Sequence, residues 1–234
     1  MTATLTTAPL DPFGYEVPEP SPDLTNYRQA HRAMRIADDQ LVEALTEIVA
    51  GDRNRAAALH HWFNGYGGEL RTHHRIEDDL IFPALAARTR EYAGYSDGLA
   101  DDHHQLDQLI DTIAAALAHM ASGSREWAPA HSVALSAAVE LRDLLLEHLD
   151  LEDADVLPMI ERNISVEDFE AIEKQLTKFM SLRQALFTVP WWMAVTEPEV
   201  AAKSYDEAPL LLKVIYALTR RSFARRTALA FGTR

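Results

Sequence analysis

The sequence predicts an all-α fold, namely an up-down-up-down antiparallel four-helix bundle with a C-terminal helical extension. Apolar residues recur at spacings of three and four over four long segments between residues 24 and 162, which is the period of a buried helix face. No segment shows the two-residue alternation of a convincing β-strand. The segments are joined by short connections, so consecutive helices should run antiparallel and bury their apolar faces together in a bundle.

Proline content and helical periodicity divide the chain of 234 residues into three parts. Residues 1–23 hold five of the 11 prolines and show no sustained periodicity, so they are predicted to be a disordered lead-in. Residues 24–162 are predicted to form the bundle, and residues 163–234 a helical extension that packs on it. The 47% hydrophobic content is sufficient to fill a core.

The first two helices form one predicted hairpin. The first should follow Asp23 and run to about Ala50, ending at Gly51, and its inward face includes His31. The second should run from about Arg53 to Ala87, although the glycines of residues 65–68 could disturb it. Its inward face carries His73 and Glu77 among apolar residues.

The next two helices form a second hairpin. One should start near Asp97 and stop at the "ASGS" of residues 121–124, with His103 inward and His104 pointing aside. The other should run from about residue 130 to residue 162, with His148 and Glu152 on its inward face. A buried His and Glu four residues apart therefore occur in both hairpins.

The extension is predicted to contain two helices. The first should begin at Ser165, which forms a capping-box pattern with Asp168, and end at about Phe187, before a break at "TVPWWM". The second is the amphipathic segment "PLLLKVIYALTRRSFARRTALAF", with arginines opposite an apolar side formed by Leu211, Val214, Ile215 and Leu218. We expect it to lie over the end of the bundle with Trp191 and Trp192 as apolar plugs; the alternative is a membrane-surface or partner-binding helix.

Composition excludes several classes of function. The chain has no cysteine, which rules out disulfides, thiolate nucleophiles and cysteine-held zinc or iron–sulfur clusters. Its net charge of −14 argues against nucleic-acid binding. It lacks a long apolar run and a signal-peptide pattern in its first thirty residues, so we expect no membrane span and a cytoplasmic location.

The strongest motif occurs twice in the sequence. "HHRIEDDLIFPAL" begins at His73 and "HLDLEDADVLPMI" begins at His148, and both read His, three residues, Glu, Asp, four residues, Pro. Each copy follows a lone inward histidine by a similar distance, 42 residues from His31 and 45 from His103. Residues i and i+4 project from one helix face, so each pair can reach one metal ion or one pair of ions.

Buried carboxylates and imidazoles need partners, and six such groups in apolar faces indicate a metal site. Imidazole and carboxylate without thiolate suit iron, manganese or zinc rather than calcium or magnesium. The predicted ligands are His31, His73, Glu77, His103, His148 and Glu152, with the two glutamates as natural bridges of a dinuclear centre. Five histidines fall off the inward faces and are expected at the surface, namely His60, His61, His104, His119 and His131.

The order of these four elements over residues 24–162 resembles the hemerythrin-like, HHE cation-binding family. The resemblance implies a four-helix bundle with two non-haem iron ions as cofactor, manganese or zinc being less typical. It also implies that the six residues ligate iron and that the glutamates bridge. The sequence departs from the oxygen-carrying members at Asp107, where they have a second histidine, and at Glu152, which stands beside the position of their last aspartate, here Asp153. His74 or Tyr66 could supply a further ligand.

This resemblance supports three hypotheses for function. The first is a binding protein that holds di-iron and carries, buffers or senses oxygen, peroxide, nitric oxide or iron itself. The alternative is an enzyme of oxidative or nitrosative stress defence that disproportionates peroxide or reduces nitric oxide. The third is a regulatory protein whose metal-stabilised bundle presents the basic C-terminal helix to a protein partner.

Overall fold

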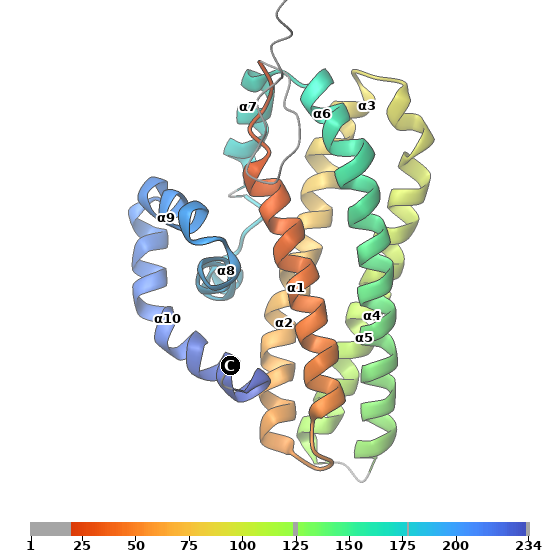
Figure 1. The fold of residues 1–234 in the computed structure, drawn as a ribbon, viewed down its shortest axis with the longest axis vertical. Coiled ribbons are helices and arrows are strands. Elements are labelled where there is room, and N and C mark those ends of the chain that lie inside the picture. Colours follow the sequence, from red (N-terminus) through yellow and green to blue (C-terminus); the bar gives the residue numbers. More distant parts are fainter. Residues whose placement is uncertain (1–19, 124–125, 177, 233–234) are drawn as a thin grey trace, which may run out of the picture.

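The computed structural model describes residues 20–123, 126–176 and 178–232, and within these ranges it contains helices and no strand (Figure 1). The predicted all-α class is therefore confirmed. Residues 1–19 of the predicted lead-in lie outside the described ranges.

Four long helices form the body of the molecule. They are α1 (Thr25–Glu47), α2 (Arg53–Ile76), α4 (Ser96–Ser122) and α5 (Trp127–Leu151), and Figure 1 shows them side by side with alternating direction. The helix α4 packs along both α2 and α5, and α1 packs along α5. Gly51 and Gly123 adopt φ of 83° and 78° at the ends of the two hairpins, where a left-handed backbone favours glycine.

The two helices that carry the duplicated motif each contain a π-helical turn. The turns η1 (Glu77–Ile81) and η3 (Glu152–Val156) both begin at the motif glutamate and continue as α3 (Phe82–Ala86) and α6 (Leu157–Asn163). The Phe82 N–H bonds the carbonyl five residues back, at Glu77. Such turns are rare and recur at functional sites. Here they carry the chain past the motif prolines, which stand at the start of α3 and α6.

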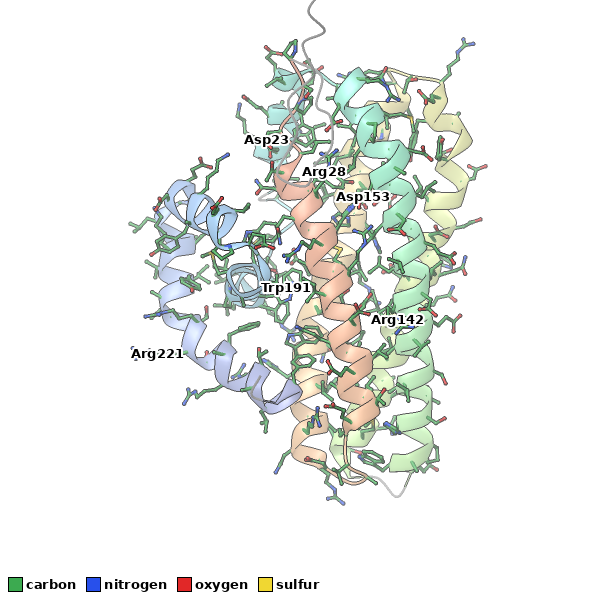
Figure 2. The ribbon with its side chains drawn as sticks, in the orientation of Figure 1. Asp23, Arg28, Arg142, Asp153, Trp191 and Arg221 are labelled. Carbon is green, nitrogen blue, oxygen red and sulfur yellow. The ribbon has the colours of Figure 1, made fainter. Side chains whose placement is uncertain are left out.

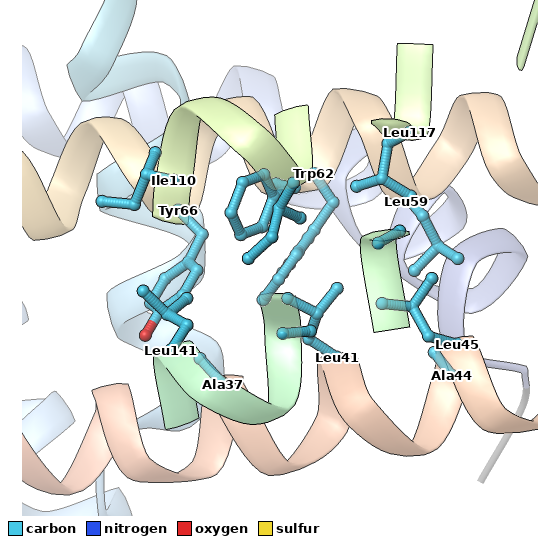
Figure 3. Close-up of a cluster of buried hydrophobic side chains, with 14 of the residues drawn as sticks. Ala37, Leu41, Ala44, Leu45, Leu59, Trp62, Tyr66, Ile110, Leu117 and Leu141 are labelled. Atoms are coloured by element: carbon cyan, nitrogen blue, oxygen red, sulfur yellow. The ribbon is translucent and has the colours of Figure 1, made fainter. Parts of the chain in front are cut away.

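Two apolar cores lie at different heights in the bundle. The larger joins side chains of the four long helices, among them Leu41, Leu59, Tyr66 and Leu141 (Figure 3). The smaller lies where the motif helices end and the 3-10 helix η2 (Glu91–Gly94) leads into α4. Along the long helices, the predicted metal ligands fall between residues of these two cores, except that His148 precedes Leu149 of the larger core. The candidate site is therefore closed above and below by apolar packing.

The extension differs from the sequence prediction in its helix boundaries. It contains α7 (Val166–Leu176), α8 (Leu182–Val195), α9 (Pro198–Glu207) and α10 (Leu210–Phe231). The first predicted helix ends early, at Leu176, and the expected break at "TVPWWM" is wrong, because this segment lies inside α8. Ser181 caps α8 by accepting a hydrogen bond from the Gln184 N–H. The cost of Pro190 within a helix is offset by burial of Trp191 against the bundle.

The extension lies along the side of the bundle and not over its end, as Figure 1 shows, with α8 and α10 against α1 and α2. Two glycines of α2 allow this approach. A Cβ on Gly65 would overlap the Phe187 ring, and a Cβ on Gly68 would press on the Gln184 side chain. These glycines do not disturb α2, which runs unbroken from Arg53 to Ile76. Their role is to let α8 pack closely.

The packed face of α10 also differs from the prediction. Of the expected apolar side, Ile215 is buried, whereas Leu211, Val214 and Leu218 are 63%, 45% and 77% exposed. The packed face is rotated around the helix from the expected one and includes Phe223 and Ala230 in addition to Ile215. Nowhere in the described ranges is a helix long and apolar enough to cross a membrane.

Candidate metal centre

All six predicted ligands meet inside the bundle, and His74 joins them. His31 and His73 lie with the two glutamates in one group whose nitrogen and oxygen atoms are within 4.8 Å of one another. His103 and His148 form a second group, also with the two glutamates and separately with His74. The centre lies near Asp153, labelled in Figure 2 between α1 and the helix of the second motif.

Glu77 and Glu152 each face both groups of histidines. Glu77 lies 2.9 Å from Nε2 of His73 and 3.5 Å from Nε2 of His103. Glu152 lies 3.3 Å from Nε2 of His31 and 3.7 Å from Nε2 of His148. Each carboxylate therefore spans the space between the two groups, which is the placement a bridging ligand requires.

The two further ligands considered from sequence have different positions. The His74 ring stacks on His103 with 4.1 Å between ring centroids, and it is 4% exposed. The Tyr66 hydroxyl instead donates to the carbonyl of Met34 at 3.3 Å, and Tyr66 belongs to neither metal-binding group of the described residues. The structure thus brings five histidines and two glutamates together, with Tyr66 outside.

Three aspartates orient the histidines from outside. Asp153 bonds Nδ1 of His31 at 2.8 Å, and Asp78 bonds Nδ1 of His103 at 3.0 Å. The third pair joins His148 Nδ1 to Asp102 at 3.2 Å. A carboxylate at Nδ1 fixes the ring and leaves Nε2 free to ligate, which is the usual arrangement around protein-bound metals. Two of these aspartates are the residues next to the motif glutamates.

Tyr27 is a site residue that sequence reasoning missed. Its hydroxyl donates a hydrogen bond to Glu77, and its ring lies against those of His31 and His73, with centroids 5.0 and 5.5 Å away. Burial and the negative charge of Glu77 raise the pKa of the phenol well above its ordinary value. Its position one helical turn before His31 was the available signal, because residues at i and i+4 share a helix face.

The two glutamates have opposite electrostatic character. Burial tends to raise both pKa values, but the nearby His73, His103 and His74 outweigh it for Glu77, whose pKa is lowered. The pKa of Glu152 is raised well above its ordinary value by burial and then by the negative charge of Glu77. Without a cation the site therefore favours one ionised and one protonated glutamate.

Buried polar atoms test whether a cation fits this site. Nε2 of His31, both ring nitrogens of His74 and both carboxylate oxygens of Glu152 are buried without a hydrogen-bond partner. Native interiors rarely leave such atoms unsatisfied, and all three residues belong to the groups of buried side chains that could hold a metal ion. Burial lowers the pKa of His31 and His74, and that of His148 to about 4, which keeps these rings in the neutral form that a metal needs. The residues fit a metal-binding role.

The histidines expected at the surface divide into two sets. His61, His104 and His119 are exposed as expected. His60 and His131 are instead half-buried, and the expectation is wrong for His131, whose Nε2 donates to the Leu45 carbonyl at 2.7 Å while its ring stacks on Trp127. It satisfies a carbonyl near the end of the bundle.

A helical bundle that buries histidines and carboxylates in this way defines a cation-binding protein. The family model described as Hemerythrin HHE cation binding domain matches residues 23–160. The chain belongs to this family, whose domains bind metal cations, typically iron. Comparisons with curated proteins and with solved structures gave no match.

Proposed function

We propose that the protein holds two metal ions, iron in preference to manganese or zinc, and binds a small ligand there. The proposed ligands are His31, His73, Glu77, His103, His148 and Glu152, with His74 as a seventh. One observation carries the proposal: two groups of ligand atoms share the same pair of glutamates. A single ion would use only one group and would leave the other as unexplained buried polar residues.

Electrostatics supports two cations. Burial and then the negative charge of Glu77 raise the pKa of Glu152. Divalent ions between the two carboxylates would remove their repulsion and allow both to ionise. The nitrogen-rich donor set without thiolate suits iron, manganese or zinc, and the family favours iron.

The residues around the centre control what can reach it. The two apolar cores exclude water from above and below, and the side chains of His31 and His148 are 0% exposed. That of His73 is 11% exposed, so we propose that a small ligand approaches beside His73. An iron pair in this position would supply open coordination positions and a change of oxidation state, which is the chemistry that binds oxygen, peroxide or nitric oxide.

Elemental analysis of anaerobically purified protein tests the metal proposal. We expect about two metal ions per chain, lost in His103→Ala and retained in His104→Ala, a matched control whose side chain is exposed. Well under one ion per chain in the unmodified protein would end the proposal.

Stopped-flow mixing of the reduced protein with oxygen tests the carrier role. A carrier should show a persistent charge-transfer band, and rapid autoxidation would contradict this role.

Tyr27 favours the enzyme as the second candidate, because its hydroxyl already donates a hydrogen bond to Glu77 and so stands beside the centre. If the centre disproportionates peroxide, Tyr27→Phe should lower turnover by about tenfold or more while the metal content stays unchanged. Peroxide turnover that is no faster than that of the free metal ion would remove this candidate.

The exposed side of α10 supports the proposal of a protein partner. Leu210, Leu211 and Leu218 are 77%, 63% and 77% exposed, and Arg221, labelled in Figure 2, points away from the bundle. A metal-gated partner role requires the metal to stabilise the fold. If thermal unfolding is the same with and without iron, this role fails.

A further inference from the structure

A second concave site lies between the bundle and the extension, away from the metal centre. It is a cleft of about 640 Å³ bordered by α2, α8 and α10. Its α2 residues span His61 to Gly65, two to three helical turns before the ligand His73. The volume falls within the usual range for small-molecule sites. Nothing in the proposed metal chemistry uses this cleft.

The cleft is basic in a chain whose net charge is −14. Arg183 and Arg226 line it, and no carboxylate does so among the described residues. In the same described ranges, Arg183 has no hydrogen bond or ion pair, and Arg226 contacts only the imidazole of His61, with 2.6 Å between Nη1 and Nε2. Guanidinium groups ordinarily pair with oxyanions, and a neutral imidazole nitrogen is a weak substitute. The cleft therefore offers two cations without their natural counter-charge.

The cleft also contains a hydroxyl group that has no hydrogen-bond partner. Thr227 lines the cleft, and its Oγ1 is buried without a hydrogen-bond partner. Thr219, two turns earlier on the same helix, bonds the carbonyl four residues back, which is how a helical threonine is normally satisfied. Thr227 therefore places an unused hydroxyl donor in the wall of the cleft.

Aromatic side chains form the apolar part of the cleft. Trp62, which is 3% exposed, meets the Phe187 ring edge-on at 6.3 Å, and Phe223 meets the same ring at 5.7 Å. All three line the cleft. Flat rings beside cations suit a ligand with a planar apolar body and an anionic group.

The geometry points to a binding site for a small aromatic anion, in which Arg183 and Arg226 hold a phosphate or carboxylate group and the aromatic rings hold the planar body. The ligand would contact both the bundle and the extension, so its binding would stabilise the packing of α8 and α10 on α2. This site is independent of the proposed metal function, and its test does not require metal.

Titration of the full chain with phenyl phosphate, benzoate and inorganic phosphate tests the site, with calorimetry as the readout and intrinsic tryptophan fluorescence in support. We expect an aromatic anion to bind and to raise the midpoint of thermal unfolding. The tighter of phenyl phosphate and benzoate identifies the anionic group. Arg226→Ala and Arg183→Ala should each weaken binding about tenfold or more, as expected when a charged hydrogen bond is lost.

Arg225→Ala is the matched control, because Arg225 is exposed and does not line the cleft. It should bind as the unmodified protein does, and circular dichroism should show all three variants to be folded. The proposal is overturned if neither aromatic anion binds at ~10 mM, or if Arg225→Ala and Arg226→Ala weaken binding equally. Equal affinity for inorganic phosphate and phenyl phosphate would overturn the aromatic part of the site.

Discussion

Asp38 should make the protein less stable as pH rises through the neutral range. Its side chain lies within the bundle at 1% exposure, close to the Tyr66 hydroxyl. Burial, only partly offset by the nearby Tyr66 hydroxyl, raises its pKa from 3.8 to about 7. The folded state therefore holds a proton that the unfolded chain releases between these two pH values.

The sign and size follow from this pKa difference. The folded state binds more protons than the unfolded state between pH 3.8 and about 7, so the free energy of unfolding falls as pH rises through this window. Each pKa unit corresponds to about 1.4 kcal/mol, so the full penalty above pH 7 is about 4 kcal/mol. Between pH 5 and pH 7 the expected loss is about 2 kcal/mol, because half of the Asp38 side chains are already ionised in the folded state at pH 7.

Asp38→Asn removes this titration and keeps the size and shape of the side chain. Urea unfolding of chelator-treated protein should show the variant more stable than the unmodified protein, by an amount that grows by about 3 kcal/mol from pH 5 to pH 8. Asp39→Asn, an exposed neighbour, should leave the pH dependence unchanged. Parallel stability curves for Asp38→Asn and the unmodified protein would refute the reasoning.

Three further predictions concern packing and metal binding. Gly65→Ala should destabilise the fold by about 1–3 kcal/mol in urea unfolding, because its Cβ would overlap the Phe187 ring. Gly98→Ala, with open space around it, should be neutral or slightly stabilising. Equal effects of the two substitutions would contradict the packing argument. Asp153→Asn should weaken metal affinity about 10- to 100-fold in a competitive chelator titration, because His31 loses its orienting carboxylate; unchanged affinity would exclude that role. Free metal at about 100 times its dissociation constant should raise the free energy of unfolding by about 3 kcal/mol, and an unchanged urea midpoint would contradict binding to the folded state.

The sequence was informative wherever helix geometry alone decides direction. Residues at i and i+4 share a face in any helix, so His73 with Glu77 and His148 with Glu152 could be placed inward without knowledge of the fold. His74 required more, because it lies about 100° around the helix from His73. Two groups of candidate ligands lie side by side in the bundle, so the neighbouring His73 and His74 reach different groups.

Prediction failed where tertiary packing chooses between two plausible faces. Leu211 and Leu218 look like core residues in sequence, but α10 packs through a rotated face that includes Ile215 and Ala230 and leaves them exposed. The "TVPWWM" segment contains a proline, yet it remains helical because Trp191 finds a buried position beside the bundle. Both outcomes depend on the close approach that Gly65 permits, and nothing local to α8 or α10 encodes that approach.

The doubled motif explains why neither hairpin forms the centre alone. Asp153 in the second copy orients His31 in the first hairpin, and Asp78 in the first copy orients His103 in the second hairpin. Adjacent residues of a helix point in different directions, so each motif glutamate can face the centre while the next aspartate faces a neighbouring helix. Each copy thus supplies one glutamate to the shared centre and one orienting aspartate to the opposite hairpin. The geometry of the centre consequently depends on the packing of both hairpins, and this couples the proposed metal binding to the assembly of the whole bundle.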